Sequence, residues 1–229
     1  MKKLFVLLIM QLISYSAWSQ TMNIHYKNGQ TVEYNMDNID YVEFTEKKQD
    51  NTQVSSEKAV DLGLSVKWAS CNVGATSPEQ LGDMFAWGET TTKEQYKEDN
   101  YLYYVSTTDS YMDIGLDIKG TDYDAAHVKW GGSWRMPTRA EFDELMKKCQ
   151  WEWVNLNGIN GYKVIGKNGN SIFLPVEKNN HYWTSDIWPS EQLKGKSESA
   201  RDIFLDNGHV FGEGKSRWRG YNIRPVMPK

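Results

Sequence analysis

Cysteine, proline and clustered basic residues are scarce in this sequence. The chain has 229 residues with 2 Cys and 6 Pro, and its formal net charge is −4. Nowhere do more than two Lys or Arg residues stand side by side. The basic patch that phosphate recognition requires is therefore missing, and we expect no nucleic-acid partner.

Long apolar runs are also rare, and the one that exists stands at the start. Residues 4–13 are almost entirely apolar, follow two lysines and precede the small residues Ala17 and Ser19. A membrane-spanning helix needs about 20 apolar residues, which this segment does not reach. The pattern is instead typical of a secretory signal peptide. We predict cleavage after residues 1–19 and a secreted protein, in the periplasm, on the outer surface or extracellular, without a transmembrane anchor.

Aromatic residues, by contrast, are plentiful. Together, 10 Trp, 13 Tyr and 7 Phe make up 13% of the chain, and 39% of all residues are hydrophobic. This composition is typical of a globular protein, and aromatic side chains favour pleated sheets over helices. Short apolar runs between turn residues predict strands. These runs are 62–69, 83–87, 101–105, 161–165, 171–174, 182–185, 202–205, 210–211 and 221–226.

The residues after the signal peptide predict a small β appendage. Apolar residues alternate with polar ones on both sides of Asn28-Gly29, which is a strong hairpin signal. A third strand is expected at 39–44, which gives a three-strand appendage over residues 20–45. Residues 46–58 are nearly devoid of apolar side chains and are interpreted as a polar linker. The main domain is then expected at 59–229.

One helix is well specified by its capping residues. Thr138 and Glu141 have the spacing of a capping box, in which each side chain bonds an amide of the first turn. An apolar stripe follows at Phe142, Leu145, Met146 and Cys149. We predict an amphipathic helix of about three turns. Weaker helix signals occur at 78–81 and 122–127.

The sequence allows the two cysteines to be either a disulfide or free thiols. Cys71 and Cys149 would be able to form one disulfide in an oxidising compartment. Cys149 also lies on the apolar stripe of the predicted helix, where a free thiol packs as a small hydrophobic group. Both interpretations stand equally.

No familiar catalytic motif is present. The four histidines lack the HExxH spacing of zinc hydrolases, and the chain has no GxSxG, no glycine-rich phosphate loop and no CxxC. The histidines are His25, His127, His181 and His209. We therefore expect a protein that is not an enzyme.

Two groups of carboxylates are weaker candidates for chemistry. Four aspartates in a Gly-containing stretch offer oxygen ligands for Ca²⁺, but they lack the spacing of a calcium loop. We therefore interpret them as solvated turn carboxylates and predict no cofactor. Three glutamates offer a carboxylate pair for glycoside hydrolysis, with nothing to fix a partner. These residues are Asp113, Asp117, Asp122 and Asp124, and Glu89, Glu141 and Glu144.

The segment WRMPT at 134–138, followed by Glu141 and Phe142, resembles a signature of the Fibrobacter succinogenes major paralogous domain family. Further segments at 60–75, 82–90, 160–175, 182–185 and 220–226 are similar to that family in the same order. The resemblance covers about residues 59–227 and implies an α+β, C-type-lectin-like domain with short strands, one clear helix and long loops. The N-terminal hairpin similarly resembles a short segment found in secreted Bacteroidetes proteins.

The resemblance extends distantly to the formylglycine-generating, sulfatase-modifying family, whose enzymes hold a metal with a cysteine pair near the end of the domain. Residues 199–229 contain no Cys, so that copper site does not carry over. Within the motif, packing and capping are the expected roles. The residues concerned are Trp134, Arg135, Pro137, Thr138, Glu141 and Arg224.

A lectin-like fold also displays loops for binding, and residues 186–222 are where such loops are expected. Exposed rings and Arg side chains are typical anchors of protein or glycan ligands. The candidate ligand-binding residues are Trp188, His209, Phe211, Arg217, Trp218 and Tyr221. For Trp218 and Tyr221, closure of the core is an equal alternative. The predicted function is non-enzymatic binding of a protein or glycan, and a structural surface subunit that docks through its hairpin is the alternative.

Overall fold

The computed structural model describes residues 21–25, 31–35, 37, 59–177, 181–188 and 194–229. It divides into two compact units, Met1–Lys48 and Gln49–Lys229. The predicted signal peptide at 1–19, the third strand predicted at 39–44 and the linker at 46–58 lie outside the described residues. Among the described residues, no helix has the length and apolar character needed to cross a membrane.

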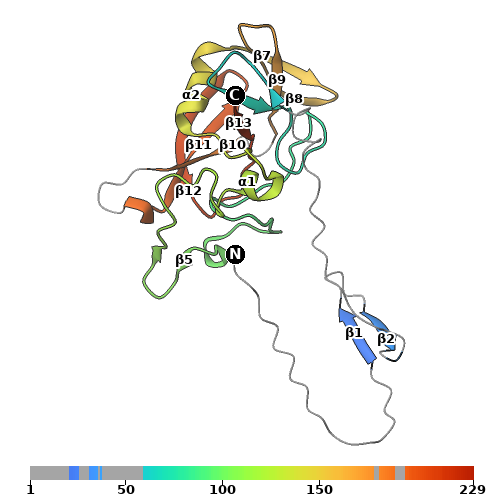
Figure 1. Cartoon of the computed structure of the whole chain (residues 1–229). Coiled ribbons are helices and arrows are strands. Elements are labelled where there is room, and N and C mark those ends of the chain that lie inside the picture. The colour runs from blue at the N-terminus through green and yellow to red at the C-terminus, as the bar shows by residue number, and fades with distance from the viewer. Residues whose placement is uncertain (1–20, 26–30, 36, 38–58, 178–180, 189–193) are drawn as a thin grey trace, which may run out of the picture. The chain divides into compact units, whose positions relative to one another are not determined.

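The N-terminal unit contains the predicted hairpin. Strands β1 (Thr21–His25) and β2 (Thr31–Asn35) pair antiparallel, with His25 opposite Thr31 (Figure 1). All five side chains of β2 are exposed, including the apolar ones of Val32 and Tyr34. Two strands alone bury too little surface to be stable in water.

The larger unit is mainly β, with few helices, and its two ends meet in one sheet. Strand β13 (Val226–Pro228) pairs antiparallel with β4 (Val66–Ala69), which also pairs with β3 (Ala59–Val60). The predicted strand at 62–69 is therefore shorter than expected. The predicted strand at 221–226 is mostly a loop that makes single bridges, such as Tyr221 with Phe85.

A second sheet is the meander of β7 (Gln150–Leu156), β8 (Ile159–Ile165) and β9 (Ser171–Pro175). Strand β7 was not among the predicted strands. Asn157 and Gly158 join it to β8 with φ of 51° and 90°, which is the left-handed pair that a tight hairpin turn requires.

The third sheet carries the candidate site. It consists of β10 (His181–Ile187), β11 (Ser199–Asp206) and β12 (His209–Ser216), all antiparallel. The β11–β12 register is regular throughout, and β10 contains an irregularity between Trp183 and Ile187.

The remaining elements are short. Strands β5 (Tyr104–Val105) and β6 (Ser110–Tyr111) form a small ribbon, and two 3₁₀ turns span Glu98–Asn100 and Lys194–Lys196. Helix α1 covers Ala125–Trp130, a few residues later than the weak signal at 122–127. The segment 78–81 contains turn structure and no helix.

The predicted helix is confirmed as α2 (Arg139–Lys148), and it forms the capping box expected from the sequence. Its buried side chains are Phe142 and Leu145, and it packs against β10 and β11 (Figure 1). Phe142 contacts Trp68 of β4 edge-to-face, with ring centroids 4.9 Å apart. Burial of a side chain of this size stabilises the fold by about 1.5–3 kcal/mol.

Three apolar clusters make up the core. The first joins α2 to the strands of all three main sheets. The second packs loops that precede α2 against β10, β11 and the segment after β12, and it includes Trp87, Trp183 and Tyr221. The third is a tyrosine-rich cluster that contains Tyr101 and Tyr111. Both Cys71 and Cys149 are free thiols, which decides between the two interpretations in favour of packing.

Candidate functional site

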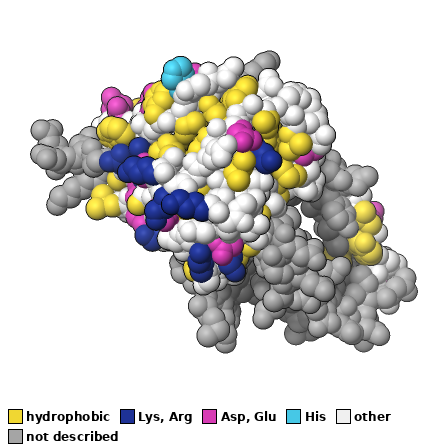
Figure 2. Space-filling model, turned by 90° about the horizontal axis from the view of Figure 1, so that it is seen from above, with side chains coloured by type: hydrophobic (Ala, Val, Ile, Leu, Met, Phe, Trp, Pro, Cys, Tyr) yellow, Lys and Arg dark blue, Asp and Glu magenta, His cyan; other side chains and the backbone are white. Residues whose placement is uncertain are grey.

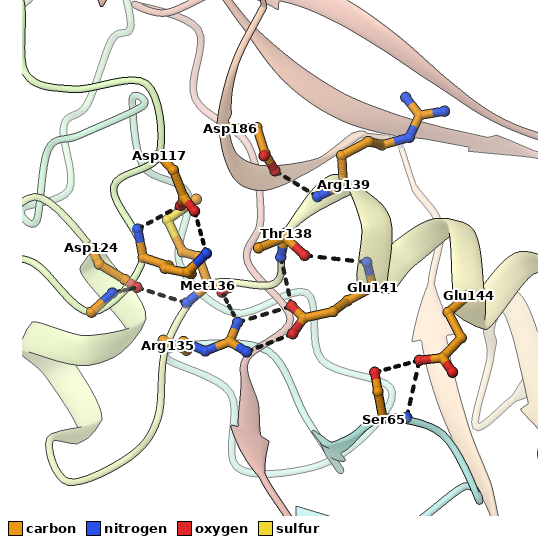
Figure 3. Close-up of polar contacts among 12 residues, drawn as sticks. Ser65, Asp117, Asp124, Arg135, Met136, Thr138, Arg139, Glu141, Glu144 and Asp186 are labelled. Atoms are coloured by element: carbon orange, nitrogen blue, oxygen red, sulfur yellow. Dashed lines mark hydrogen bonds and ion pairs between the residues drawn. The ribbon is translucent and has the colours of Figure 1, made fainter.

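The WRMPT segment and the residues after it build the start of α2. Arg135 donates from Nη1 and Nη2 to the two carboxylate oxygens of Glu141, at 2.9 and 2.5 Å, and Glu141 also accepts from the Thr138 amide at 2.8 Å (Figure 3). Burial alone would raise the pKa of Glu141, but the bonds from Arg135 and Thr138 lower it on balance. Trp134 and Pro137 are buried beside this ion pair. The motif therefore supplies the N-terminal cap of α2 and an ion pair to its first turn.

The two arginines proposed for separate roles are both buried. Arg224 donates to Asn72 Oδ1 and to the carbonyls of Ala69 and Phe173, at 2.8 to 3.0 Å, so it holds loops together as expected. Arg217 was expected on an exposed binding face, and this expectation is wrong because its side chain is fully buried. It donates to Tyr101 Oη and lies over the Trp87 ring.

The other ring residues of the expected loop face do not form one surface. Tyr221 is buried and closes the core, and burial raises its pKa to about 12. Trp218 is half-buried against the tyrosine-rich cluster. Trp188 and Phe211 are exposed, at 39% and 42%. They belong to opposite faces of one sheet, because Trp188 lies against Gly214 and side chains three positions apart on β12 point to opposite sides.

A continuous line of rings instead runs along the face of β10–β12 that carries Phe211. We call it the aromatic row and define it as Tyr221, His181, Phe204 and Phe211. The Tyr221 and His181 rings stack with centroids 4.5 Å apart at 18°, and the next two steps are each 5.1 Å. Exposure increases along the row, from buried Tyr221 to exposed Phe211. The row thus connects the exposed ring of Phe211 to the buried ring of Tyr221.

Three titratable side chains meet beside the aromatic row. His181, Asp202 and Glu213, which we call the His181 cluster, come from β10, β11 and β12 and place ligand-type atoms within 4.8 Å of one another. His181 Nδ1 lies 2.5 Å from Asp202 Oδ2, and Lys215 Nζ lies 2.6 Å from Glu213 Oε2. Burial raises the pKa of Asp202, an effect that His181 partly offsets.

The cluster is graded in exposure like the aromatic row. The side chain of Asp202 is fully buried, and those of His181 and Glu213 keep 16% and 30% of their surface. Asp202 Oδ1 has no hydrogen-bond partner among the described residues. The arrangement therefore places a buried carboxylate with an unpartnered oxygen beside two side chains that are only partly buried.

The acidic groups considered from sequence are engaged elsewhere. Asp124 is buried and accepts from the Gly120, His127 and Met136 amides, so it caps α1 (Figure 3). Glu144 accepts from the Ser65 amide at 3.0 Å and from Lys148 Nζ at 2.7 Å. Among the described residues, neither the aspartates at 113–124 nor the three glutamates make up a metal-type cluster.

Sequence reasoning missed the His181 cluster, although part of it carried a signal. Asn207-Gly208 is a hairpin dipeptide, and counting outward from it pairs Asp202 with Glu213, as the structure does. His181 joins only through the pairing of β10 with β11, for which the sequence has no short turn. His209, the candidate nearest to this turn, is exposed and pairs with Asp206 at 2.7 Å.

The described part of the chain thus brings together aromatic and titratable groups on one sheet, in place of the single loop face expected. Comparisons of the chain with protein-family models, with curated proteins and with solved structures found no match.

Proposed function

We propose that the protein is an exported, non-enzymatic recognition module with a C-type-lectin-like domain, which binds a glycan through the exposed end of the aromatic row. The observation that carries the proposal is Phe211. This ring is 42% exposed, yet it packs on Phe204 and, through it, on the stacked His181. Large rings left in water by a fold that can bury others favour a ligand surface.

The groups around Phe211 suit a sugar. A sugar ring presents a flat face of C–H groups that packs on an aromatic ring, and its hydroxyls need hydrogen-bond acceptors and donors nearby. Glu213 and Lys215 lie on the same face of β12 as Phe211 and remain partly exposed. On the face seen in Figure 2, basic and acidic side chains lie beside one another.

A groove lined by residues outside the aromatic row is the alternative place for a ligand. It measures about 330 Å³ and is lined mainly by the β7–β9 sheet, with Leu156, Lys163 and Phe173 among its residues. Its lining mixes apolar side chains with Ser, Asn and Lys, and Phe173 is buried, so it offers no open ring face. We therefore place the ligand on the aromatic row.

The test is a screen of the secreted chain against an array of glycans and, in parallel, of peptides. We expect glycan binding that Phe211→Ala weakens at least about tenfold, which is ~1.4 kcal/mol. Leu102→Ala is the matched control, because Leu102 is a 68% exposed apolar residue outside the row. Unchanged binding by Phe211→Ala would remove the proposal, and binding to peptides alone would replace the ligand class.

The hairpin supports a second candidate function, that of a structural surface subunit. Every side chain of β2 is exposed, and an exposed strand can add to a sheet of another chain. Deletion of residues 20–50 should then abolish assembly or localisation while glycan binding persists. Normal assembly of the deleted chain would argue against docking by the hairpin.

A further inference from the structure

We infer that the His181 cluster is a binding site for a divalent transition-metal ion, held by the imidazole of His181 and the carboxylates of Asp202 and Glu213. Each of three paired strands supplies one ligand, and the three ligand-type atoms lie within 4.8 Å of one another. The inference goes beyond the proposed glycan binding and shares Glu213 with it, so its test measures ion binding in the absence of any sugar.

The unpartnered oxygen of Asp202 is the second observation that points to a ligand. The Asp202 side chain is fully buried, and its Oδ1 has no hydrogen-bond partner among the described residues. A buried acceptor without a partner costs about 1–3 kcal/mol, and more when it is charged. A cation held by both carboxylate oxygens of Asp202 would satisfy Oδ1 as well as Oδ2.

The positions of the other two ligands also fit. His181 is held between the rings of Tyr221 and Phe204, at centroid distances of 4.5 and 5.1 Å, so its nitrogen is aimed before any ion arrives. Glu213 faces Asp202 directly across the β11–β12 pair. Its present ion pair with Lys215 is not an aligned hydrogen bond. Lys215 is one-third exposed and can turn into water when an ion replaces it.

Ion binding requires only a small adjustment. Ligand atoms about 2.1 Å from a tetrahedral ion lie about 3.4 Å apart. His181 Nδ1 and Asp202 Oδ2 are now 2.5 Å apart, which is hydrogen-bond distance, so one proton lies between them. The ion would take the place of that proton, and the two side chains would separate by less than 1 Å as the proton leaves to solvent.

The ligand set selects the kind of ion. One nitrogen and two carboxylates suit Zn²⁺ and neighbouring transition metals, whereas Ca²⁺ and Mg²⁺ prefer oxygen alone. Three protein ligands leave one position of a tetrahedral Zn²⁺ open for water. The side chains of His181 and Glu213 keep 16% and 30% of their surface, so two of the three ligand side chains contact solvent.

The experiment titrates the whole chain, without a polyhistidine tag, with ZnCl₂ by calorimetry and with CoCl₂ by visible absorption. We expect one ion per chain, and His181→Gln and Glu213→Gln should each raise the Kd at least about tenfold, because even the indirect partners of metal ligands have effects of this size. His209→Gln is the matched control, since His209 also pairs with an aspartate but has no third ligand among the described residues.

Glu213 is partly exposed, so we expect Glu213→Gln to fold even if His181→Gln does not. Circular dichroism checks that this variant is folded. Binding that survives in both cluster variants, or that is lost only in His209→Gln, would overturn the inference. The same holds if the unmodified chain binds neither ion. CaCl₂ in place of ZnCl₂ should give no comparable signal, and preference for Ca²⁺ would contradict the assigned chemistry.

Discussion

Replacement of Arg217 by Ala should destabilise the domain by about 3–5 kcal/mol. The guanidinium donates to Tyr101 Oη and to the Met112 carbonyl, both at 3.0 Å, and to the Ser197 carbonyl at 3.3 Å. It also lies over the Trp87 ring, with its central carbon 5.0 Å from the centroid. Hydrogen bonds from a charged donor contribute about 1.5–3 kcal/mol each, and burial of the charge cancels part of this gain.

Truncation to Ala would leave the two carbonyls without a donor and a cavity among the rings. Arg217→Met fills most of the cavity and removes the buried charge, so its loss should be smaller, about 1–3 kcal/mol. Arg219→Ala is the matched control, because Arg219 is exposed two residues away and should change stability by less than about 0.5 kcal/mol.

Urea denaturation measures these differences directly. At a slope of about 2 kcal/mol per molar urea, Arg217→Ala should lower the unfolding midpoint by about 1.5–2.5 M. A midpoint within about 0.5 M of the unmodified chain would refute the assignment of Arg217 to the core, as would an equal effect of Arg219→Ala.

Three further predictions concern α2 and its neighbours. Thr138→Ala should cost about 1 kcal/mol through one lost cap, and Leu145→Ala about 2–5 kcal/mol through a core cavity; urea melts in the reverse order would contradict the helix assignment. Hydrogen bonds from Lys148 and Ser65 outweigh burial and hold the pKa of Glu144 at about 2, below its ordinary 4.5. Its stabilising effect should therefore be complete above about pH 4.5 and decline as the pH falls toward 2, so that acid melts of Glu144→Gln show a smaller loss over this range. Finally, a Cβ at Gly214 would lie 2.5 Å from the Trp188 ring, so Gly214→Ala should shift the Trp188 signal in fluorotryptophan NMR, and an unshifted signal would exclude this contact.

The start of α2 shows how much local sequence determines. Thr138 and Glu141 lie three residues apart, and their mutual hydrogen bonds need no distant partner. The capping box and the apolar stripe of the helix could therefore be predicted from the sequence. The first hairpin was also expected from the sequence, but its register pairs His25 with Thr31, one position away from the pairing that a two-residue turn at Asn28-Gly29 would give. Strand β7 was not predicted, even though Asn157-Gly158 precedes β8. Its side chains are only partly buried on both faces, so apolar and polar residues alternate weakly along it.

Burial and long-range pairing, in contrast, were decided by the tertiary structure. Arg217 and Phe211 have similar surroundings in the sequence, but Arg217 fits among rings contributed by residues about 100 positions earlier, whereas Phe211 ends a row that faces water. The His181 cluster joins residues 21 and 11 positions apart along the chain. The pairing of Asp202 with Glu213 follows from a short turn. The contact of His181 with Asp202 depends instead on the register of β10 against β11. That register follows from which side chains the whole core accepts, so no local pattern specifies it.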